Sequence, residues 1–585
     1  MHFSPPEIPI TLGHFYLEAA HVNTRTAVSD YLSRQVRVLC WVMTHPRGHQ
    51  RALHAMNTWG KRCNKVLLMS TEKDPRVPTI PLEVQEGKDY LYWKSLAAFA
   101  YIYDNHRKEA DWFLKADDDT FVIVENVRFM LSIYNHSEPL YFGHRFQHFT
   151  SQGYMSGGAG YVLSGAALDR LIQHGYYGNR CTSIDFHGAE DVSIGVCLDD
   201  LQVKAMDSRD VYLRERFFPF IPSLHMFPSS REGVPSWYQL YTLYPQNDGI
   251  NCCSDFAISF HYILPEEMHL FDYLLYHLRP YGVDYKHSMY DQAMYNLKTD
   301  GKHRRSLEPP KPAVIKTVAG AYSSFVKILC WVMTRPETHA TRAAHVKATW
   351  GKRCDILLFM STEKDNSLPT VKLNVQEGPD FLWRKTRTAF RYVHRHYIDR
   401  ADWFLKADDD TYVIVENLRF MLFNYDTQRP IYFGHRCKDK SKQSYMSGGA
   451  GYVLSRDALD KLINTGLPAH APCSKRGQGN EDLQMGKCLE SIGVRAMDSR
   501  DLYSRERFLP LALTNQFPVD FKKHPWEHPT TYYKSRKGFD CCSDFAITFH
   551  GIDPQSMYLL DALVYHIRPY GIDYKHDPSS DSYEQ

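Results

Sequence analysis

Three consecutive aspartates follow an apolar stretch at two places in this chain. The segment Trp112–Lys115 leads into Asp117–Asp119, and a second set stands at Asp408–Asp410. Adjacent carboxylates repel one another, and desolvation at the end of a strand adds to the cost, which a divalent cation relieves. Hard oxygen ligands suit Mg²⁺ or Mn²⁺. The first and third aspartates of each set are therefore candidate metal ligands, namely Asp117, Asp119, Asp408 and Asp410. The alternative is that they are solvated aspartates of a loop.

A second acidic pattern also occurs twice. Glu190 and Asp191 precede VSIGVCL, and Glu481 and Asp482 precede LQMGKCL, both helix-like stretches. A carboxylate held near a reacting hydroxyl can act as a general base. Acidic residues at a helix start also favour the helix dipole and cap the first turn. The residues alone leave both interpretations open.

The glycine-rich segment Tyr154–Gly160 (YMSGGAG) precedes an apolar YVL. Glycines allow close backbone approach to a ligand or positive φ angles. The segment does not follow the phosphate-loop pattern. We interpret it as part of a ligand site or as a plain tight turn.

These patterns belong to a repeat that covers most of the chain. Ala110–Thr120 recurs unchanged at Ala401–Thr411, and the other blocks recur at a spacing near 290 residues. Solenoid repeats have periods of about 20–50 residues, so this period indicates two complete domains from a duplication. We predict a lead-in at 1–35, domains at 36–287 and 325–576, a linker at 288–324 and a polar tail at 577–585.

The order of apolar runs predicts an α/β fold in each copy. Val36–Met43 and Lys65–Ser70 are typical of buried parallel strands, and Trp112–Lys115 predicts another. Arg51–Trp59 and Tyr90–His106 have helical spacing. Strands that alternate with helices indicate a mostly parallel sheet, which binds ligands at the carboxyl ends of its strands. The aspartates follow such an end.

Composition narrows the class of protein. Apolar residues make up 43% of the 585 residues and charged residues 23%, which is typical of a soluble globular protein. The net charge of +2 gives no overall field that would attract nucleic acid or a membrane surface. Residues 1–34 contain no apolar run of about 18 residues, so we see neither a membrane anchor nor a signal peptide.

The cysteines point to an oxidising compartment. Of 13 cysteines, six recur in both copies, and Cys437 stands alone because the first copy has Phe146 there. Such a set predicts a disulfide framework, although six cysteines allow 15 connectivities. Cys252 and Cys253 are either a vicinal disulfide or two thiols. The recurring pairs are Cys40/Cys330, Cys63/Cys354, Cys181/Cys473, Cys197/Cys488, Cys252/Cys541 and Cys253/Cys542.

Several ordered blocks together resemble a known family. VLCWVMT, QEGKD, WFLKADDDT, YFGHR, YMSGGAGYVLS, DSRD, CCSDFAISFH and YHLRPYG stand in this order in the first copy, and their close counterparts follow in the second. The pattern resembles the glycoprotein-N-acetylgalactosamine β1,3-galactosyltransferases, the core 1 enzymes of the β1,3-glycosyltransferase family. The resemblance covers about 250 residues twice, in the first copy and again in the second.

The resemblance implies two tandem GT-A domains and a specific reaction. Galactose would pass from UDP-galactose to the 3-hydroxyl of GalNAc on Ser or Thr of a glycoprotein, with inversion and with Mn²⁺ as cofactor. The family is held in the Golgi lumen by an N-terminal membrane helix, which this chain does not show, so we expect a truncated start or a soluble lumenal form.

The resemblance also implies roles for individual residues. Metal ligands would be Asp117, Asp119 and His261, with Asp408, Asp410 and His550 in the second copy. Residues near the UDP would be Met43, Glu86, Gly87 and Lys94, with Met333, Glu377, Gly378 and Lys385. The bases would be Asp191 and Asp482, and Trp237 and Tyr238 would bind the acceptor.

Two other functions remain open. The chain could be a related β1,3-glycosyltransferase with another donor or acceptor, or one copy could be silent and act as a chaperone or glycan-binding module. We expect the first copy to be the better enzyme, because the second has no Trp that matches Trp237 and has Gly551 in place of Tyr262. The alternative is that Trp237 is a core residue and that the nearby Trp526 substitutes for it.

Overall fold

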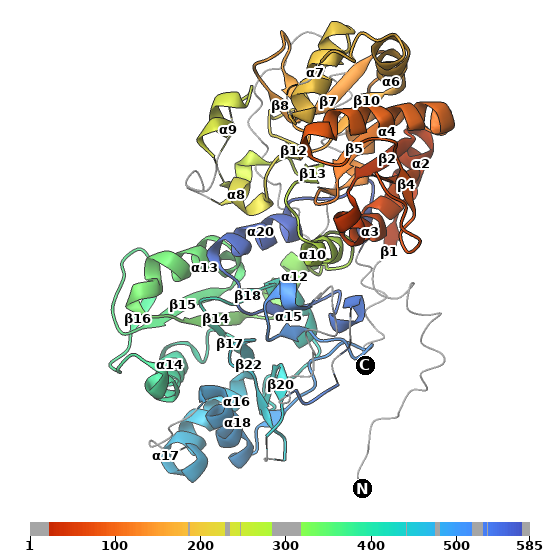
Figure 1. The fold of residues 1–585 in the computed structure, drawn as a ribbon. Coiled ribbons are helices and arrows are strands. Elements are labelled where there is room, and N and C mark those ends of the chain that lie inside the picture. The colour runs from red at the N-terminus through yellow and green to blue at the C-terminus, as the bar shows by residue number, and fades with distance from the viewer. Residues whose placement is uncertain are drawn as a thin grey trace.

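The computed structural model describes residues 23–283 and 318–575, except for 185, 187, 228–234, 246, 248, 440–441, 474–479, 517–530, 535 and 537. The described part forms two α/β domains that meet near the centre of the molecule (Figure 1). The predicted tail, nearly all of the predicted linker and Trp526 lie outside the described residues.

A seven-stranded, mostly parallel sheet forms the centre of the first domain. Its strand order is β11-β7-β10-β5-β2-β3-β4. Strand β2 pairs in parallel with β3 and β5, whereas β10 runs antiparallel to β5 and β7. The strands are β2 (Val38–Met43), β3 (Lys65–Ser70), β4 (Thr79–Pro81), β5 (Trp112–Asp117), β7 (Leu140–Gly143), β10 (Tyr161–Ser164) and β11 (Lys204–Ala205).

Helices cover this sheet much as the apolar periodicity predicts. Helix α4 (Leu91–His106) buries Leu96, Phe99 and Ile102, and the Phe99 ring meets Trp41 of β2 edge-on at 5.0 Å. All six residues of β2 are buried, so a helix face must lie on both sides of the strand. The other helices are α3 (His49–Asn57), α5 (Val124–Leu131), α6 (Gly165–Arg170), α7 (Glu190–Asp200), α8 (Pro222–Met226), α9 (Ser236–Tyr241) and α10 (Pro265–Tyr276).

A small second sheet brings the end of each copy back to the first aspartates. In the first copy β12 (Phe217–Phe218), β13 (Ser259–Phe260) and β6 (Phe121–Val122) pair in the order β12-β13-β6. Because β6 begins shortly after Asp119 and β13 ends just before His261, their pairing places these two side chains together.

The second domain repeats this arrangement. Its large sheet has the order β16-β15-β14-β17-β22-β19-β23, and its small sheet has the order β18-β25-β24. The strands are β14 (Ile328–Met333), β15 (Ile356–Ser361), β16 (Thr370–Lys372), β17 (Trp403–Asp408), β18 (Tyr412–Val413), β19 (Ile431–Gly434), β22 (Tyr452–Ser455), β23 (Arg495–Ala496), β24 (Phe508–Leu509) and β25 (Thr548–Phe549). The helices are α13 (Ala344–Ala348), α14 (Leu382–Tyr397), α15 (Val415–Leu422), α16 (Arg456–Lys461), α17 (Leu467–Ala469), α18 (Glu481–Ser491), α19 (Leu513–Gln516) and α20 (Pro554–Tyr565).

A helix precedes the large sheet of each domain. Helix α2 (Ala27–Gln35) occupies the end of the predicted lead-in, and α12 (Val318–Phe325) occupies the corresponding place before the second domain. Strand β1 (Asn23–Arg25) pairs with β26 (Asp573–Lys575), so the two ends of the described chain lie side by side. No helix in the described ranges has both the length and the apolar character needed to cross a membrane.

The predicted disulfide framework is present in both domains. Cys40 bonds to Cys63, Cys181 to Cys197, and Cys252 to its neighbour Cys253. The second domain repeats these as Cys330–Cys354, Cys473–Cys488 and Cys541–Cys542. Cys437 is buried and is the one described cysteine that takes part in none of these disulfides. The vicinal disulfide is therefore the correct alternative for both double cysteines.

Candidate active site

Two carboxylates and one imidazole converge at the carboxyl end of β5. The Nε2 atom of His261 lies 3.1 Å from Oδ1 of Asp119 and 4.0 Å from Oδ2 of Asp117. The ligand atoms of all three residues fall within 4.8 Å of one another, and Asp408, Asp410 and His550 repeat the cluster. Two hard oxygens and one imidazole nitrogen suit a divalent first-row cation, so the predicted ligand sets fit a metal ion.

His261 is oriented by a contact on its far side. Its Nδ1 atom donates a hydrogen bond to the carbonyl oxygen of Pro219 at 3.2 Å, since a carbonyl can only accept. This contact fixes the tautomer that leaves Nε2 free as a ligand atom, as is usual for metal-binding histidines. In the second copy His550 makes the same contact with Pro510 at 3.1 Å.

The middle aspartate of each set turns away from this cluster. Asp118 accepts a hydrogen bond from the Thr44 hydroxyl at 2.7 Å and pairs with Nε of Arg51 at 2.7 Å. Burial raises the pKa of Asp118 to about 6. All three carboxylates line the cavity, but only the first and third lie close enough to His261 to share one cation with it.

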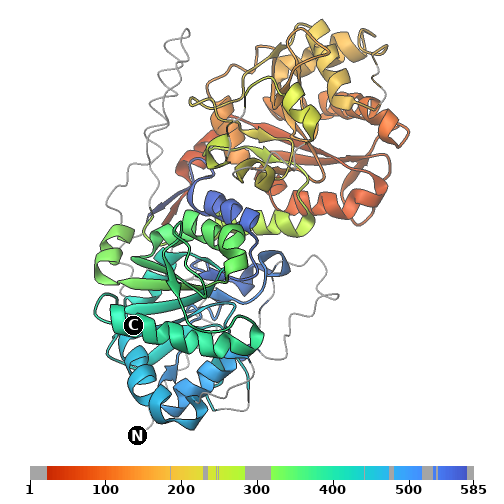
Figure 2. The ribbon, with the colours of Figure 1, turned by 90° about the vertical axis from the view of Figure 1, so that its left-hand side faces the viewer.

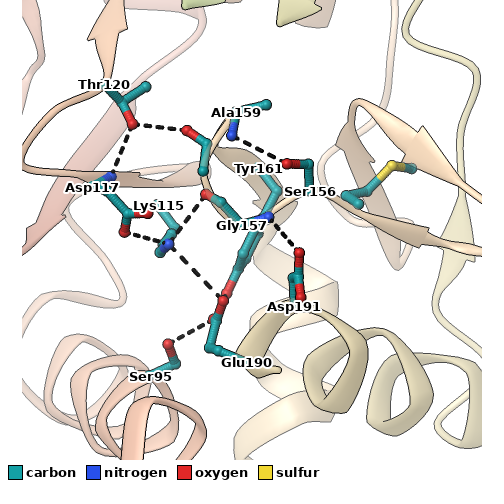
Figure 3. A network of polar contacts seen from close by, with 12 residues as sticks. Ser95, Lys115, Asp117, Thr120, Ser156, Gly157, Ala159, Tyr161, Glu190 and Asp191 are labelled. Atoms are coloured by element: carbon teal, nitrogen blue, oxygen red, sulfur yellow. Dashed lines mark hydrogen bonds and ion pairs between the residues drawn. The ribbon is translucent and has the colours of Figure 1, made fainter. Parts of the chain in front are cut away.

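A buried lysine connects the metal cluster to the second acidic pair (Figure 3). Nζ of Lys115 donates to Oδ1 of Asp117 at 2.6 Å and to the Gly157 carbonyl at 3.1 Å, and lies 3.9 Å from Glu190. Burial alone would lower the pKa of Lys115, but the carboxylates of Asp117 and Glu190 raise it above its usual value. The lysine is therefore a fixed positive charge beneath the site.

Asp191 stands at the first turn of α7, next to the glycine-rich segment. Its Oδ2 accepts from the Gly157 amide at 3.1 Å and its Oδ1 from the Val192 amide at 2.9 Å. Burial raises the pKa of Asp191. Its neighbour Glu190 instead points inward, where Ser95 and Tyr161 donate hydrogen bonds to it at 2.7 and 2.8 Å. Both residues line the cavity, and Asp191 is the more exposed of the two.

The glycines of YMSGGAG are required by these contacts. A Cβ atom at Gly158 would overlap the His261 ring, and one at Gly157 would come 2.9 Å from Oε2 of Glu190. Gly448 and Gly449 meet the corresponding residues of the second copy. The segment is thus a wall of the site, and its glycines make room for the metal-facing histidine and the acidic pair.

The residues predicted near UDP line the same cavity, which encloses about 800 Å³ in the first copy. Nζ of Lys94 donates to the Thr44 carbonyl at 2.6 Å and pairs with Glu86 at 2.9 Å. The Lys94 charge is therefore already compensated by Glu86. Met43, Glu86, Gly87 and Lys94 lie in this cavity with Asp117, Asp119, Asp191 and His261. Met333, Glu377, Lys385, Asp408, Asp410, Asp482 and His550 line a cavity of about 460 Å³ in the second copy.

Aromatic rings extend from His261 toward the acceptor residues predicted in the first copy. Tyr262 stacks on His261 at 3.8 Å and contacts Phe220 at 6.1 Å, and Phe220 in turn contacts Trp237 and Tyr238. Trp237 is 45% exposed, so it is not a core residue, whereas Tyr238 is 2% exposed and lies beneath it. We call Tyr262, Phe220, Trp237 and Tyr238 the aromatic patch.

The second copy keeps fewer of these rings. Phe217 and Phe508 hold the same place in the small sheets, which makes Leu511 the counterpart of Phe220. Gly551 follows His550 where Tyr262 follows His261. The β-bridges Phe146–Thr242 and Cys437–Thr531 set the register of the following segment. Counting back from these bridges sets Trp526 opposite Trp237 in sequence, but Trp526 lies outside the described residues, so the expected difference at this position stays a prediction.

Sequence reasoning missed three residues that build the site. These are Lys115, Thr44 and Arg51. Lys115 binds Asp117, whereas Thr44 and Arg51 bind Asp118, so the two carboxylates point in different directions. A lysine inside the apolar strand WFLKAD, repeated in both copies, was the available signal for Lys115, because a buried lysine needs a carboxylate partner. Nothing in the pattern distinguished Thr44 or Arg51 from ordinary surface residues.

The fold and the two acidic sites define a pair of GT-A-like glycosyltransferase domains. The chain belongs to the Fringe-like family, whose model matches residues 38–217 and 324–553. One matched region falls in each copy, which fits a tandem duplication.

The chain is also similar to individual proteins of known name. The chain is 46% identical over 279 residues to glycoprotein-N-acetylgalactosamine 3-beta-galactosyltransferase 1 of Xenopus laevis, which covers 48% of this chain and 75% of that protein. It is 28% identical over 200 residues to a beta-1,3-glucosyltransferase of Homo sapiens, covering 33% of this chain and 39% of that protein. A solved glycosyltransferase involved in the glycosylation of the major capsid of PBCV-1 is 13% identical, with a TM-score of 0.24, and the match covers 41% of this chain and 100% of the other.

Proposed function

We propose that this chain transfers galactose from UDP-galactose to the 3-hydroxyl of GalNAc linked to Ser or Thr, with inversion at the anomeric carbon. One observation carries the proposal: Asp191 and the carboxylates of Asp117 and Asp119 line one cavity, on either side of Gly157 of the glycine-rich segment (Figure 3). Inversion needs a base on the face of the sugar opposite the leaving diphosphate, and this arrangement separates base and metal ligands in that way.

Each side of the cavity has a separate task in this reaction. Asp191 takes the proton of the acceptor hydroxyl as the new glycosidic bond forms, and its buried setting keeps water away from the reacting carbon. Asp117, Asp119 and His261 would hold Mn²⁺, which when bound supplies positive charge for the departing diphosphate. Lys115 holds Asp117 in place from below at 2.6 Å.

The acceptor side consists of the aromatic patch in the first copy. An aromatic face packs against the apolar face of a sugar ring while polar groups fix its hydroxyls. Exposed Trp237 and Tyr262 offer such faces beside His261. The first copy is therefore the better galactosyltransferase, since the second has Leu511 and Gly551 at two positions of the patch.

We also propose that the chain works in the Golgi lumen. Six disulfides, three in each domain, need an oxidising compartment. Glycoproteins that carry GalNAc are the acceptors there. Localisation of the tagged chain in cells tests this, and a cytosolic signal would contradict it.

The activity is tested by incubating the purified full chain with Mn²⁺, a GalNAc-threonine peptide and one labelled UDP-sugar at a time. We expect transfer from UDP-galactose, and a β1,3 linkage in the NMR spectrum of the product. Transfer only from UDP-glucose or UDP-N-acetylglucosamine, or only to another acceptor, would favour a different β1,3-glycosyltransferase. A peptide without GalNAc is the matched acceptor control.

A further inference from the structure

The last turn of each copy lies in the other copy. Tyr281, from the RPYG sequence at the end of the first copy, stacks on Phe420 of α15 with ring centroids 3.7 Å apart. Tyr570, from the RPYG sequence at the end of the second copy, stacks on Phe129 of α5 at 3.8 Å. The two contacts are reciprocal, because Phe420 and Phe129 are the same position of the two repeats.

Hydrogen bonds from backbone amides fix the position of each exchanged turn in the other copy. The Tyr281 amide donates to Oδ1 of Asn417 at 2.7 Å, and the Tyr570 amide donates to Oδ1 of Asn126 at 2.8 Å. The Arg279 amide donates to the Asp544 carbonyl at 2.7 Å. All of these partners belong to the opposite copy. Each RPYG turn is therefore held by hydrogen bonds of the domain that receives it, as that domain's own segments are.

The segment that receives the turn follows the double cysteine. Asp544 and Phe545 come directly after Cys541, Cys542 and Ser543, and Phe545 contacts the Tyr281 ring at 5.9 Å. In the first copy Phe256, after Cys252 and Cys253, contacts Tyr570 at 5.5 Å. A vicinal disulfide therefore lies directly before the receiving segment in each copy.

Burial shows that these turns complete the opposite core. Tyr281 is 2% exposed and Tyr570 is 8% exposed. Their partners Phe129 and Phe420 are 4% and 5% exposed. Removing either RPYG turn would therefore leave an apolar cavity in the other copy. Such a cavity lowers the free energy of unfolding of the domain that contains it.

We propose that the two copies are a fused pair that exchanges its C-terminal turns, so that each domain needs the other to be complete, whether or not the other turns over substrate. The partner surface of each copy is a second copy of the same fold. Helices α10 and α20 pack against each other where the two domains meet (Figures 1 and 2).

The contact surface also reaches the first active site. Helix α20 of the second copy packs on α8 of the first. Phe227, which follows α8, contacts the rings of Tyr558 and His345 at 5.4 and 5.3 Å. The segment before α8 carries Pro219, whose carbonyl orients His261. The second copy thus supports the segment that positions a metal-facing residue of the first.

The test keeps all residues of both domains and cuts only the chain between them. A protease recognition sequence replaces residues 301–312, cleavage is verified by denaturing electrophoresis, and the cut protein is examined by size-exclusion chromatography. We expect the two halves to elute together at the position of the uncut 68.1 kDa chain. Elution as two separate folded halves would overturn the proposal. This measurement needs no substitution in either domain and no enzymatic activity.

Substitutions then identify the contacts that hold the halves together. Tyr281→Ala with Tyr570→Ala removes both exchanged rings, and we expect the dissociation constant of the cut halves to rise at least tenfold. Tyr177→Ala is the matched control, since Tyr177 is 52% exposed and lies outside these contacts, and it should leave the halves together. An unchanged dissociation constant in the double variant would contradict the role of the turns.

A second arm, which rests on the proposed galactosyl transfer, tests the connection to the first site. In a full chain that carries Asp482→Asn, we expect Tyr558→Ala to lower kcat/KM at least threefold, whereas Leu502→Ala, at a position 59% exposed, should not. An equal change in kcat/KM in the two variants would show that the second copy does not support the first active site. If no variant transfers galactose, the proposed function fails while the elution result still decides the exchange.

Discussion

The backbone amide of Gly157 donates a hydrogen bond to Oδ2 of Asp191 at 3.1 Å, and Gly448 and Asp482 repeat this contact at 3.0 Å. The contact ties the glycine-rich segment to the candidate base. Because the Gly157 carbonyl also accepts a hydrogen bond from Nζ of Lys115, one residue connects the candidate base to the lysine beneath the candidate metal ligands.

The first prediction is that Gly157→Ala lowers transfer. A Cβ atom there would come 3.3 Å from Cβ of Asp191 and 2.9 Å from Glu190, so the base must shift. Displacing a catalytic group by about 1 Å costs up to about 100-fold in rate. We expect kcat to fall by about 10- to 100-fold in a chain that also carries Asp482→Asn. Gly320→Ala is the control, since nothing lies within 4 Å of a Cβ atom there.

The second prediction concerns pH. Burial raises the pKa of Asp191, and the base must be deprotonated to act. Activity is therefore full well above the raised pKa and is lost as the pH falls through it, at a higher pH than an ordinary aspartate would give. The pH profile of kcat/KM, measured in the Asp482→Asn chain with a fold check at each pH, tests this. An acid limb below about pH 4 would contradict it.

The third prediction separates the three adjacent aspartates. Asp119→Asn with Asp410→Asn removes one carboxylate from each cluster, and we expect Mn²⁺-dependent transfer to be lost while the thermal unfolding midpoint stays close to that of the parent. Asp118→Asn with Asp409→Asn changes the middle aspartates, which accept hydrogen bonds from Thr44 and Thr334 and lie outside the two ligand clusters. Those variants should keep their affinity for Mn²⁺ in a direct binding titration. Equal loss of metal binding in both pairs would show that the middle aspartates are also ligands.

Much of this architecture was predictable from local sequence signals. The apolar runs predicted β2, β3 and β5, and the spacing predicted α3 and α4, because each signal lies within a single element. The D-x-D aspartates were predictable since β5 ends there. The inward turn of Asp118 and the pairing of Lys94 with Glu86 were not, because they depend on side chains from other elements. The exchange of the RPYG turns depends on contacts more than 100 residues apart in sequence, such as Tyr281 with Asn417.

The fourth prediction exchanges one residue between the copies. Tyr262 and Gly551 have similar positive φ angles, of 59° and 69°, so the exchange needs no new backbone conformation, although a side chain at position 551 carries the strain of a positive φ. Burying an aromatic ring against a ligand contributes about 1–3 kcal/mol. We expect Tyr262→Gly to raise the acceptor KM about fivefold or more in a chain with Asp482→Asn. Gly551→Tyr should lower the acceptor KM in a chain with Asp191→Asn. An unchanged KM in both would show that Tyr262 does not contact the acceptor.

The central claim is that Asp191 and Asp482 are the bases of a galactosyl transfer. The most direct test compares the full chain with its Asp191→Asn and Asp482→Asn double variant, using UDP-galactose, Mn²⁺ and a GalNAc-threonine peptide, with UDP binding measured in parallel. A general base contributes about 10²–10⁴-fold to a rate. We predict that the double variant loses at least about 100-fold in kcat while it still binds UDP. Transfer at the parental rate in the double variant would contradict this account.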